Sequence, residues 1–389
     1  MHPAVTAAAF EFATAGRILV GAGRAADLPA VLAGLGSRVL VCTGADTGRH
    51  AALLTRLGLP AVVFPVPAEP TVGRARSAVA AAREHGADVV VAIGGGSVID
   101  TGKAVAMLLA NGGDPLDYLE VAGSGREITQ PALPCVAVPT TAGTGAEVTA
   151  NAVLASPEHG LKASLRSPLM LPRVALVDPA LTVSCPPPVT ASSGLDALTQ
   201  CLEPFVSARA NPVTDGLARE GLRRAAAGLR AAYADGGNLA ARSDMATCSL
   251  LGGLALANAK LGAVHGLAGV VGGVAGVPHG IACAALLAPV IEANVRALSA
   301  RHGARHAALD RYAEAAQIMT ASPGASAADG VAWIRETVRL LAIPRLAAFG
   351  LRPGQAGDIA AKAARSSSMQ GNPVALTQDE LRAVLLAAI

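Results

Sequence analysis

Aromatic and charged residues are both scarce in this chain of 389 residues, at 2% and 15% of the sequence. A core with so few rings has to be built from small and aliphatic side chains, and hydrophobic residues make up 52% of the chain. Such a composition suits helices packed on helices or on a parallel sheet. The net charge is only +3 and the basic residues are scattered, so we expect no nucleic-acid partner.

The six cysteines form no CxxC pair. Several lie in apolar stretches, as expected for buried free thiols in a reducing compartment. The six are Cys42, Cys135, Cys185, Cys201, Cys248 and Cys283. A basic segment followed by an apolar one, typical of a signal peptide, does not open the sequence. We therefore expect a cytoplasmic protein.

Asp, Glu, Lys and Arg are all absent between Leu261 and Ile291. A stretch of that length could span a bilayer. It also contains Pro278, seven glycines and the histidines His265 and His279. We therefore expect a closely packed pair of buried helices around a site, and no membrane association.

Short β-branched runs alternate with helical patterns in the first half of the chain. The strand-like runs are 38–44, 61–64, 87–97 and 133–145, and the helical stretches between them are 45–58, 72–86 and 98–110. Strands alternating with helices predict a doubly wound, parallel, Rossmann-like sheet.

The pattern changes at "CPPP" (185–188), because three prolines neither continue a helix nor pair in a sheet. We expect an α/β domain over 1–185 and an all-helical domain over 186–389. The predicted helices of the second domain are 189–208, 212–233, 239–260, 280–299, 305–320, 326–342, 354–366 and 378–388.

Two glycine-rich segments follow predicted buried strands. In "AIGGGSVIDTGK" (92–103) a strand runs into glycines and then a helix, whose first N–H groups can bind a phosphate. In "PTTAGTGAEVT" (139–149) the hydroxyls of Thr140, Thr141 and Thr144 lie on a loop with Gly143 and Gly145. Neither segment matches a general nucleotide fingerprint, and each alone could be an ordinary connecting turn. Together, at the carboxyl ends of parallel strands, they favour a bound nucleotide.

A third group consists of Asp196, His265 and His279, each in apolar sequence. A lone histidine in such surroundings is usually a satisfied core residue. One carboxylate with two imidazoles can also hold a divalent metal and leave a coordination position open. Gln200 follows Asp196 by one helical turn, on the same face.

These segments together resemble the iron-containing (group III) alcohol dehydrogenase superfamily. The family's nucleotide loop GGGSxxDxxK is similar to "GGGSVIDTGK", and its PTTAGTGSEVT to "PTTAGTGAEVT". Its metal-binding helix is similar to "SSGLDALTQCLEPFVS", and its later histidine pair to "GAVHGLAG" and "VPHGIACA". The resemblance runs in order from about Leu40 to the C-terminus.

The resemblance implies a dinucleotide-binding α/β domain (1–185), a helical metal and substrate domain (186–389) and a site in the cleft between them. The implied activity is that of an NAD(P)-dependent alcohol dehydrogenase or aldehyde reductase, an oxidoreductase acting on CH–OH groups. Implied cofactors are NAD or NADP and a divalent metal, Fe or Zn. The implied partners are a small alcohol or aldehyde and a second copy of the chain in a homodimer.

The implied cofactor-binding residues lie in the two glycine-rich segments and after the first strand: Gly44, Gly94, Gly95, Gly96, Ser97, Asp100, Thr140, Thr141 and Thr144. Asp196, Gln200, His265 and His279 match the metal-ligand positions, and His265, His279 and Lys162 are the candidate catalytic residues.

Three positions depart from the family pattern. Gln200 stands where family members with a full iron site have His, and an amide oxygen is a poorer ligand for a transition metal. Gly44 stands where an Asp often binds the adenosine ribose, which removes a barrier to NADP. Gly269 replaces a further histidine of some members.

Gln200 leaves three possibilities: weak ligation through oxygen, a position behind the ligands, or a metal-free site. The last would make the chain similar to maleylacetate reductases, although their dianionic substrates call for basic residues that 261–291 lacks. A lyase such as dehydroquinate synthase, or a non-catalytic nucleotide-binding protein, are further alternatives. We favour a metal centre of reduced affinity.

Overall fold

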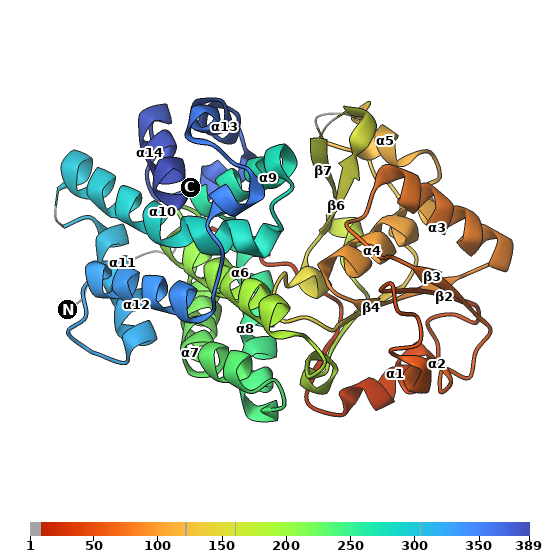
Figure 1. The fold of residues 1–389 in the computed structure, drawn as a ribbon. Helices are drawn as coiled ribbons and strands as arrows, with labels where there is room; N and C mark the ends of the chain where they lie inside the picture. Colours follow the sequence, from red (N-terminus) through yellow and green to blue (C-terminus); the bar gives the residue numbers. More distant parts are fainter. Residues whose placement is uncertain (1–8, 121–122, 160, 304) are drawn as a thin grey trace. The chain divides into compact units, whose positions relative to one another are not determined.

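The protein is described from a computed structural model, for residues 9–120, 123–159, 161–303 and 305–389 (Figure 1). The chain divides into two compact units, one of which is Thr14–Cys185. The other is Pro186–Ile389 together with the described residues up to Ala13. The prediction placed the residues up to Ala13 in the α/β domain (1–185), whereas the structure places them in the helical unit. They are held there by Asn258: Ala13 N–H donates to Asn258 Oδ1 (2.7 Å), and Asn258 Nδ2 donates to Ala13 O (3.0 Å).

The α/β unit is built on a six-stranded parallel sheet of order β1-β8-β5-β4-β2-β3. Its strands are β1 (Ile18–Val20), β2 (Val39–Thr43), β3 (Ala61–Pro65), β4 (Val89–Gly94), β5 (Cys135–Pro139) and β8 (Val174–Val177). Strands β2, β4, β5 and β8 are buried along their whole length, which explains their unbroken runs of Val, Ala and Leu.

Helices cover both faces of this sheet, and each face has its own apolar core (Figure 1). One core includes α3 (Val72–His85) and α4 (Gly96–Asn111), and the other includes α1 (Leu28–Leu32) and α2 (Ala51–Leu54). A further short helix is α5 (Pro115–Tyr118). The predicted doubly wound sheet is confirmed.

Two features of this unit differ from the prediction. The helix expected over 45–58 is only the four residues of α2, because Asp46 Oδ1 accepts from Gly48 N–H (3.0 Å) and forms a turn. An antiparallel pair of strands, β6 (Asn151–Ser156) and β7 (Leu161–Arg166), forms a separate sheet that was not predicted.

The second unit is helical in all its described regular elements apart from single turns. Its helices are α6 (Pro187–Val206), α7 (Pro212–Ala234), α8 (Leu239–Ala259), α9 (Ala263–Ala275), α10 (His279–His302), α11 (Ala307–Thr320), α12 (Ala327–Leu340), α13 (Ala356–Ala363) and α14 (Gln378–Ala388). The prolines at 186–188 were expected to form a linker, but Pro186 is the N-cap residue of α6 and Pro187 its first residue. Proline is tolerated in the first turn of a helix, where its missing N–H is not needed.

The uncharged stretch from Leu261 to Ile291 forms α9 and the first half of α10. They are separated by a break at which Gly276 has a left-handed φ of 63°. Helix α10 is long and apolar enough to cross a membrane, but 72% of its most apolar window is buried inside the protein. It packs on α6, α9 and α14, so it is a core helix of this unit.

Candidate metal centre and nucleotide loops

The two glycine-rich segments lie side by side at the carboxyl ends of neighbouring strands, β4 and β5. Thr140 N–H donates to Gly94 O (2.9 Å). A Cβ atom at Gly96 would lie 2.7 Å from Thr144 Cγ2, and one at Gly95 would lie 3.3 Å from Thr141 Oγ1. The absence of side chains at these glycines is what lets the threonine loop approach the start of α4.

Helix α4 begins at Gly96 with no side-chain cap at Gly95, its N-cap residue. Val98 and Ile99 N–H both donate to Gly95 O, whereas the N–H groups before them point out of the helix end. Backbone N–H groups at an uncapped helix start form a site for a phosphate. The geometry therefore suits Gly94, Gly95, Gly96 and Ser97 for binding a pyrophosphate, and their predicted role stays a prediction.

Gly44 directly follows β2, the neighbour of β4 on its other side. The strand order reverses between these two strands, since β3 lies outside β2 and β5 lies beyond β4. Dinucleotides bind at such reversals in open parallel sheets. The placement of Gly44 thus suits a residue near the adenosine end of a dinucleotide.

Asp100 has protein partners for both of its carboxylate oxygens. Oδ2 accepts from Val153 N–H (3.0 Å) and Oδ1 lies 3.1 Å from Lys103 Nζ. Lys103 is fully buried and also donates to Ala146 O (2.8 Å). These contacts join α4 to β6 and to the threonine loop, so Asp100 shapes the loop, and its predicted contact with the cofactor stays a prediction.

Four potential metal ligands of the helical unit converge: Asp196 on α6, His265 on α9, and His279 and Cys283 on α10. One donor atom from each lies within 4.8 Å of all the others. Asp196 Oδ1 is 3.4 Å from His265 Nε2 and 3.6 Å from His279 Nε2. The structure thus brings together Asp196, His265 and His279 as predicted, and adds Cys283, which the sequence reasoning missed.

Close helix packing brings the donors together. A Cβ atom at Gly280 would lie 2.4 Å from Ser192 O on α6, a separation that only glycine permits. The first turn of α10 therefore rests directly on the backbone of α6, beside Asp196. The break between α9 and α10 lets His265 and His279 approach from two directions, with ring centroids 5.3 Å apart.

Unpaired buried atoms show that a cation fits among these residues. Asp196 Oδ1, His265 Nε2 and Gln200 Oε1 are buried, and none has a hydrogen-bond partner among the described residues. An unpaired buried carboxylate oxygen is costly unless an ion compensates it. Bonds of about 2.0–2.1 Å to a tetrahedral zinc would place neighbouring N and O donors about 3.3–3.4 Å apart. The two distances, 3.4 Å and 3.6 Å, are close to that spacing.

Glu203, also missed from the sequence, orients His265. Its Oε2 lies 2.6 Å from His265 Nδ1, and its Oε1 accepts from Val264 N–H at the start of α9 (2.7 Å). A carboxylate beside Nδ1 keeps the proton on that nitrogen, which leaves the lone pair of Nε2 for a metal. Glu203 is 4% exposed, so little solvent competes for these bonds.

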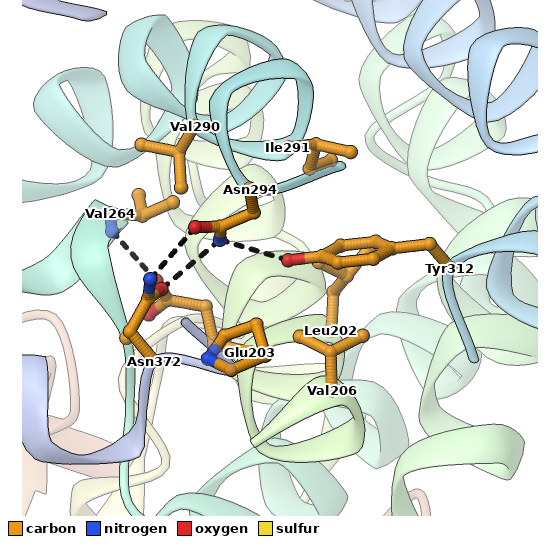
Figure 2. A pocket seen from close by; sticks show the side chains of 11 residues that line it. Leu202, Glu203, Val206, Val264, Val290, Ile291, Asn294, Tyr312 and Asn372 are labelled. Carbon is orange, nitrogen blue, oxygen red and sulfur yellow. Dashed lines mark hydrogen bonds between the residues drawn. The ribbon is translucent and has the colours of Figure 1, made fainter. Parts of the chain in front are cut away.

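A buried polar network extends behind Glu203 (Figure 2). Asn372 Oδ1 accepts from Ala263 N–H (3.1 Å), and its Nδ2 donates to Asn294 Oδ1 (2.7 Å). Asn294 Nδ2 in turn donates to the hydroxyl of Tyr312 (2.9 Å). Figure 2 shows these side chains around a small cavity that Glu203 also lines. The network fixes the first turn of α9 and therefore the position of His265.

The ionisable groups of the centre shift one another's pKa values before any cation binds. Burial acts to raise the pKa of Asp196, but the facing His279 and His265 lower it overall. The pKa of His279 rises to about 9, because the negative charge of Cys283 raises it more than burial lowers it, and Asp196 adds to the effect. Burial lowers the pKa of His265, yet Cys283, Asp196 and Glu203 raise it well above its ordinary value. A divalent cation would replace these protons, so its affinity should increase with pH.

Gln200 and Lys162, the other predicted residues, have different surroundings. Gln200 is 3% exposed and lies one turn after Asp196 on α6, and its oxygen has no hydrogen-bond partner in the described part of the chain. Lys162 belongs to β7 of the α/β unit and pairs with Glu69. Its predicted catalytic role stays a prediction.

Comparison with known proteins agrees with these observations. The family model for iron-containing alcohol dehydrogenase matches residues 15–179, and the model for the C-terminal part of the Fe-containing alcohol dehydrogenase family matches residues 190–389. Alcohol dehydrogenase 4 of Saccharomyces cerevisiae is 34% identical over 347 residues, which cover 88% of this chain and 87% of the yeast protein.

Solved structures give the same result. The crystal structure of a 1,3-propanediol oxidoreductase has a TM-score of 0.91 at 32% identity, covering 98% of this chain and 100% of the other. The sulfoacetaldehyde reductase of Bifidobacterium kashiwanohense, solved with NAD+, has a TM-score of 0.86 at 30% identity, covering 98% and 99%.

Proposed function

The chain belongs to the iron-containing alcohol dehydrogenase family and is an NAD(P)-dependent oxidoreductase acting on CH–OH groups. We propose that Asp196, His265 and His279 hold its divalent metal. The observation that carries the proposal is the buried Asp196 Oδ1, which has two imidazole nitrogens within 3.6 Å and no hydrogen-bond partner among the described residues. In a metal-free site only the protonated imidazoles of His265 and His279 could compensate this carboxylate, and neither makes a hydrogen bond to it.

A divalent metal bound there would polarise the oxygen of the alcohol or aldehyde, while the nicotinamide exchanges the hydride. The residues of the chain prepare the site for this chemistry. Asp196 supplies negative charge, and Glu203 keeps the Nε2 lone pair of His265 directed at the centre. The His279 side chain is 43% exposed, which leaves the centre open to a ligand on that side.

In the α/β unit, Gly94, Gly95, Gly96 and Ser97 hold the pyrophosphate on the N-terminus of α4. The hydroxyls of Thr140, Thr141 and Thr144 contact the nucleotide. The support is the contact between the two loops, in which the threonines lie against the glycines.

Gly44 permits NADP as well as NAD. A carboxylate at this position would repel the 2′-phosphate of NADP, and Gly44 has none. The next carboxylate along the chain is that of Asp46, and its Oδ1 accepts a hydrogen bond from Gly48 N–H within its own turn. We therefore expect this chain to use both dinucleotides.

The substrate we propose is a small or medium-sized aliphatic alcohol or the corresponding aldehyde. His265 and His279 stand among Gly, Ala, Val and Leu, and no charged residue occurs from 261 to 291 to bind a dianion. The 1,3-propanediol oxidoreductase with a similar structure acts on an aliphatic alcohol by its name. We further propose a cytoplasmic homodimer.

The test is elemental analysis of the purified protein, with NADH and NADPH oxidation measured on a panel of aldehydes before and after chelation. We expect about one metal per chain, loss of activity on chelation and recovery with a single divalent ion. Asp196→Asn should lose both metal and activity while retaining its fold. Full activity of metal-free protein would contradict the proposal.

A further inference from the structure

We propose that the Cys283 thiolate is the fourth protein ligand of the metal centre, at the coordination position that Gln200 does not fill. The inference rests on the proposed function, because it requires a metal at Asp196, His265 and His279. It assigns to this chain a donor set of one carboxylate, two imidazoles and one thiolate.

The position of Cys283 on α10 supports this role. It follows His279 by four residues, so both side chains leave the same face of the helix. Cys283 Sγ lies 3.6 Å from His279 Nε2 and within 4.8 Å of the donor atoms of Asp196 and His265. A tetrahedral zinc with a bond of about 2.3 Å to sulfur and about 2.0–2.1 Å to nitrogen would place these two donors about 3.5–3.6 Å apart. Cys283 therefore already stands at the spacing of a ligand.

Donor strength favours Cys283 over Gln200. A thiolate is a much stronger ligand than an amide oxygen for zinc or cobalt. Cys283 and Asp196 are both buried, so little solvent competes with them for a bound cation. Gln200 Oε1 remains free to accept from a bound water or from the substrate hydroxyl.

The identity of the metal should follow from this donor set. Thiolate ligands favour zinc over iron(II), whereas a set of carboxylate and imidazoles alone is less selective. Zinc with four protein ligands can accept a fifth during a reaction, so the centre need not be purely structural. We expect zinc, rather than iron, to be retained by this chain when both are supplied.

The experiment uses cobalt(II) as the probe, because a thiolate bound to cobalt(II) gives an intense near-ultraviolet charge-transfer band that oxygen and nitrogen ligands do not give. The full-length protein is stripped of metal, loaded with one equivalent of cobalt(II) and scanned. The same scan is made on Cys283→Ser, Cys283→Ala and Gln200→Ala. Cys248→Ala, which removes another buried thiol of the same unit, is the matched control. Circular dichroism checks that each variant is folded.

We expect the band in the wild-type protein, Gln200→Ala and Cys248→Ala, and its loss in both Cys283 variants. Zinc affinity, measured by competition with a chelating dye, should fall about 100-fold or more in Cys283→Ala and far less in Gln200→Ala. A wild-type protein that binds cobalt without the band, or a Cys283→Ser that keeps it, would overturn the inference and leave the proposed function standing. Failure of the proposed function is seen separately, as the absence of aldehyde-dependent NAD(P)H oxidation by the metal-loaded enzyme.

Discussion

Replacing Glu203 with Gln should weaken metal binding by about 10- to 100-fold without unfolding the protein. The side chains have nearly the same shape, but Glu203 accepts two hydrogen bonds through two oxygens, from Val264 N–H (2.7 Å) and His265 Nδ1 (2.6 Å). Gln has only one acceptor oxygen. If that oxygen retains Val264, the amide NH2 faces Nδ1, and His265 must accept there. The proton then moves to Nε2, the nitrogen that should bind the metal.

The magnitude follows from the bond that is lost. A hydrogen bond to a buried charged group contributes about 1.5–3 kcal/mol. Each 1.4 kcal/mol corresponds to about a tenfold change in affinity, which gives a loss of about 10- to 150-fold. That range agrees with the about 10- to 100-fold effects of removing a carboxylate behind a metal-bound histidine.

The assay is a zinc or cobalt titration in competition with a chelating dye, at a pH where wild-type binding is saturable. Glu292→Gln is the control, because Glu292 lies on α10 in an exposed pair with Arg335 (2.9 Å), and exposed pairs contribute about 0.2–1 kcal/mol. The thermal midpoints of the metal-free proteins should remain close. A Glu203→Gln protein that binds metal within about threefold of wild type would show that Glu203 does not set the tautomer of His265.

Two further predictions concern the α/β unit. Gly44→Asp should reduce kcat/KM for NADPH relative to NADH by about tenfold or more, because the new carboxylate would repel the 2′-phosphate. The substitution should be tolerated, since a Cβ atom at Gly44 meets nothing within 4 Å among the described residues. Steady-state kinetics with both cofactors tests this, and an unchanged ratio would refute it. Glu147 is buried, and burial raises its pKa from 4.5 to about 7, although Lys103 lowers it. The folded state therefore binds the proton of Glu147 more tightly than the unfolded state does. The stability that this protonation contributes is lost as pH rises from about 4.5 to 7. Above pH 7 the free energy of unfolding of Glu147→Gln should exceed that of the wild type by up to about 3 kcal/mol, and below about pH 4.5 the two values should converge. Urea unfolding at a series of pH values measures this difference, and a difference independent of pH would exclude the ionisation of Glu147 as its cause.

The architecture was largely predictable because its periodicities are long and clear. The sheet strands β2, β4 and β5 are unbroken apolar runs between helical patterns, and α7, α8 and α14 end within a residue of their predicted limits. The antiparallel pair of β6 and β7 was not predicted, because "NAVLAS" and "LKASLR" are short and mixed. Strand β1 is only three residues long and depends on its pairing with β8 rather than on its own sequence.

The missed residues of the metal centre had a signal that is recognisable once the helices are known. Asp196, Gln200 and Glu203 stand at i, i+4 and i+7 on α6, which places three polar side chains on one buried helix face. His279 and Cys283 repeat the i, i+4 spacing on α10. Each of these residues, taken alone, could be an ordinary buried residue of the core, and Cys283 an ordinary core thiol. The deciding information is that α6 and α10 touch at Gly280, and no periodicity within either helix specifies that contact. A polar stripe on a buried helix therefore predicts that a ligand is held, while the packing of the helices determines which side chains share it.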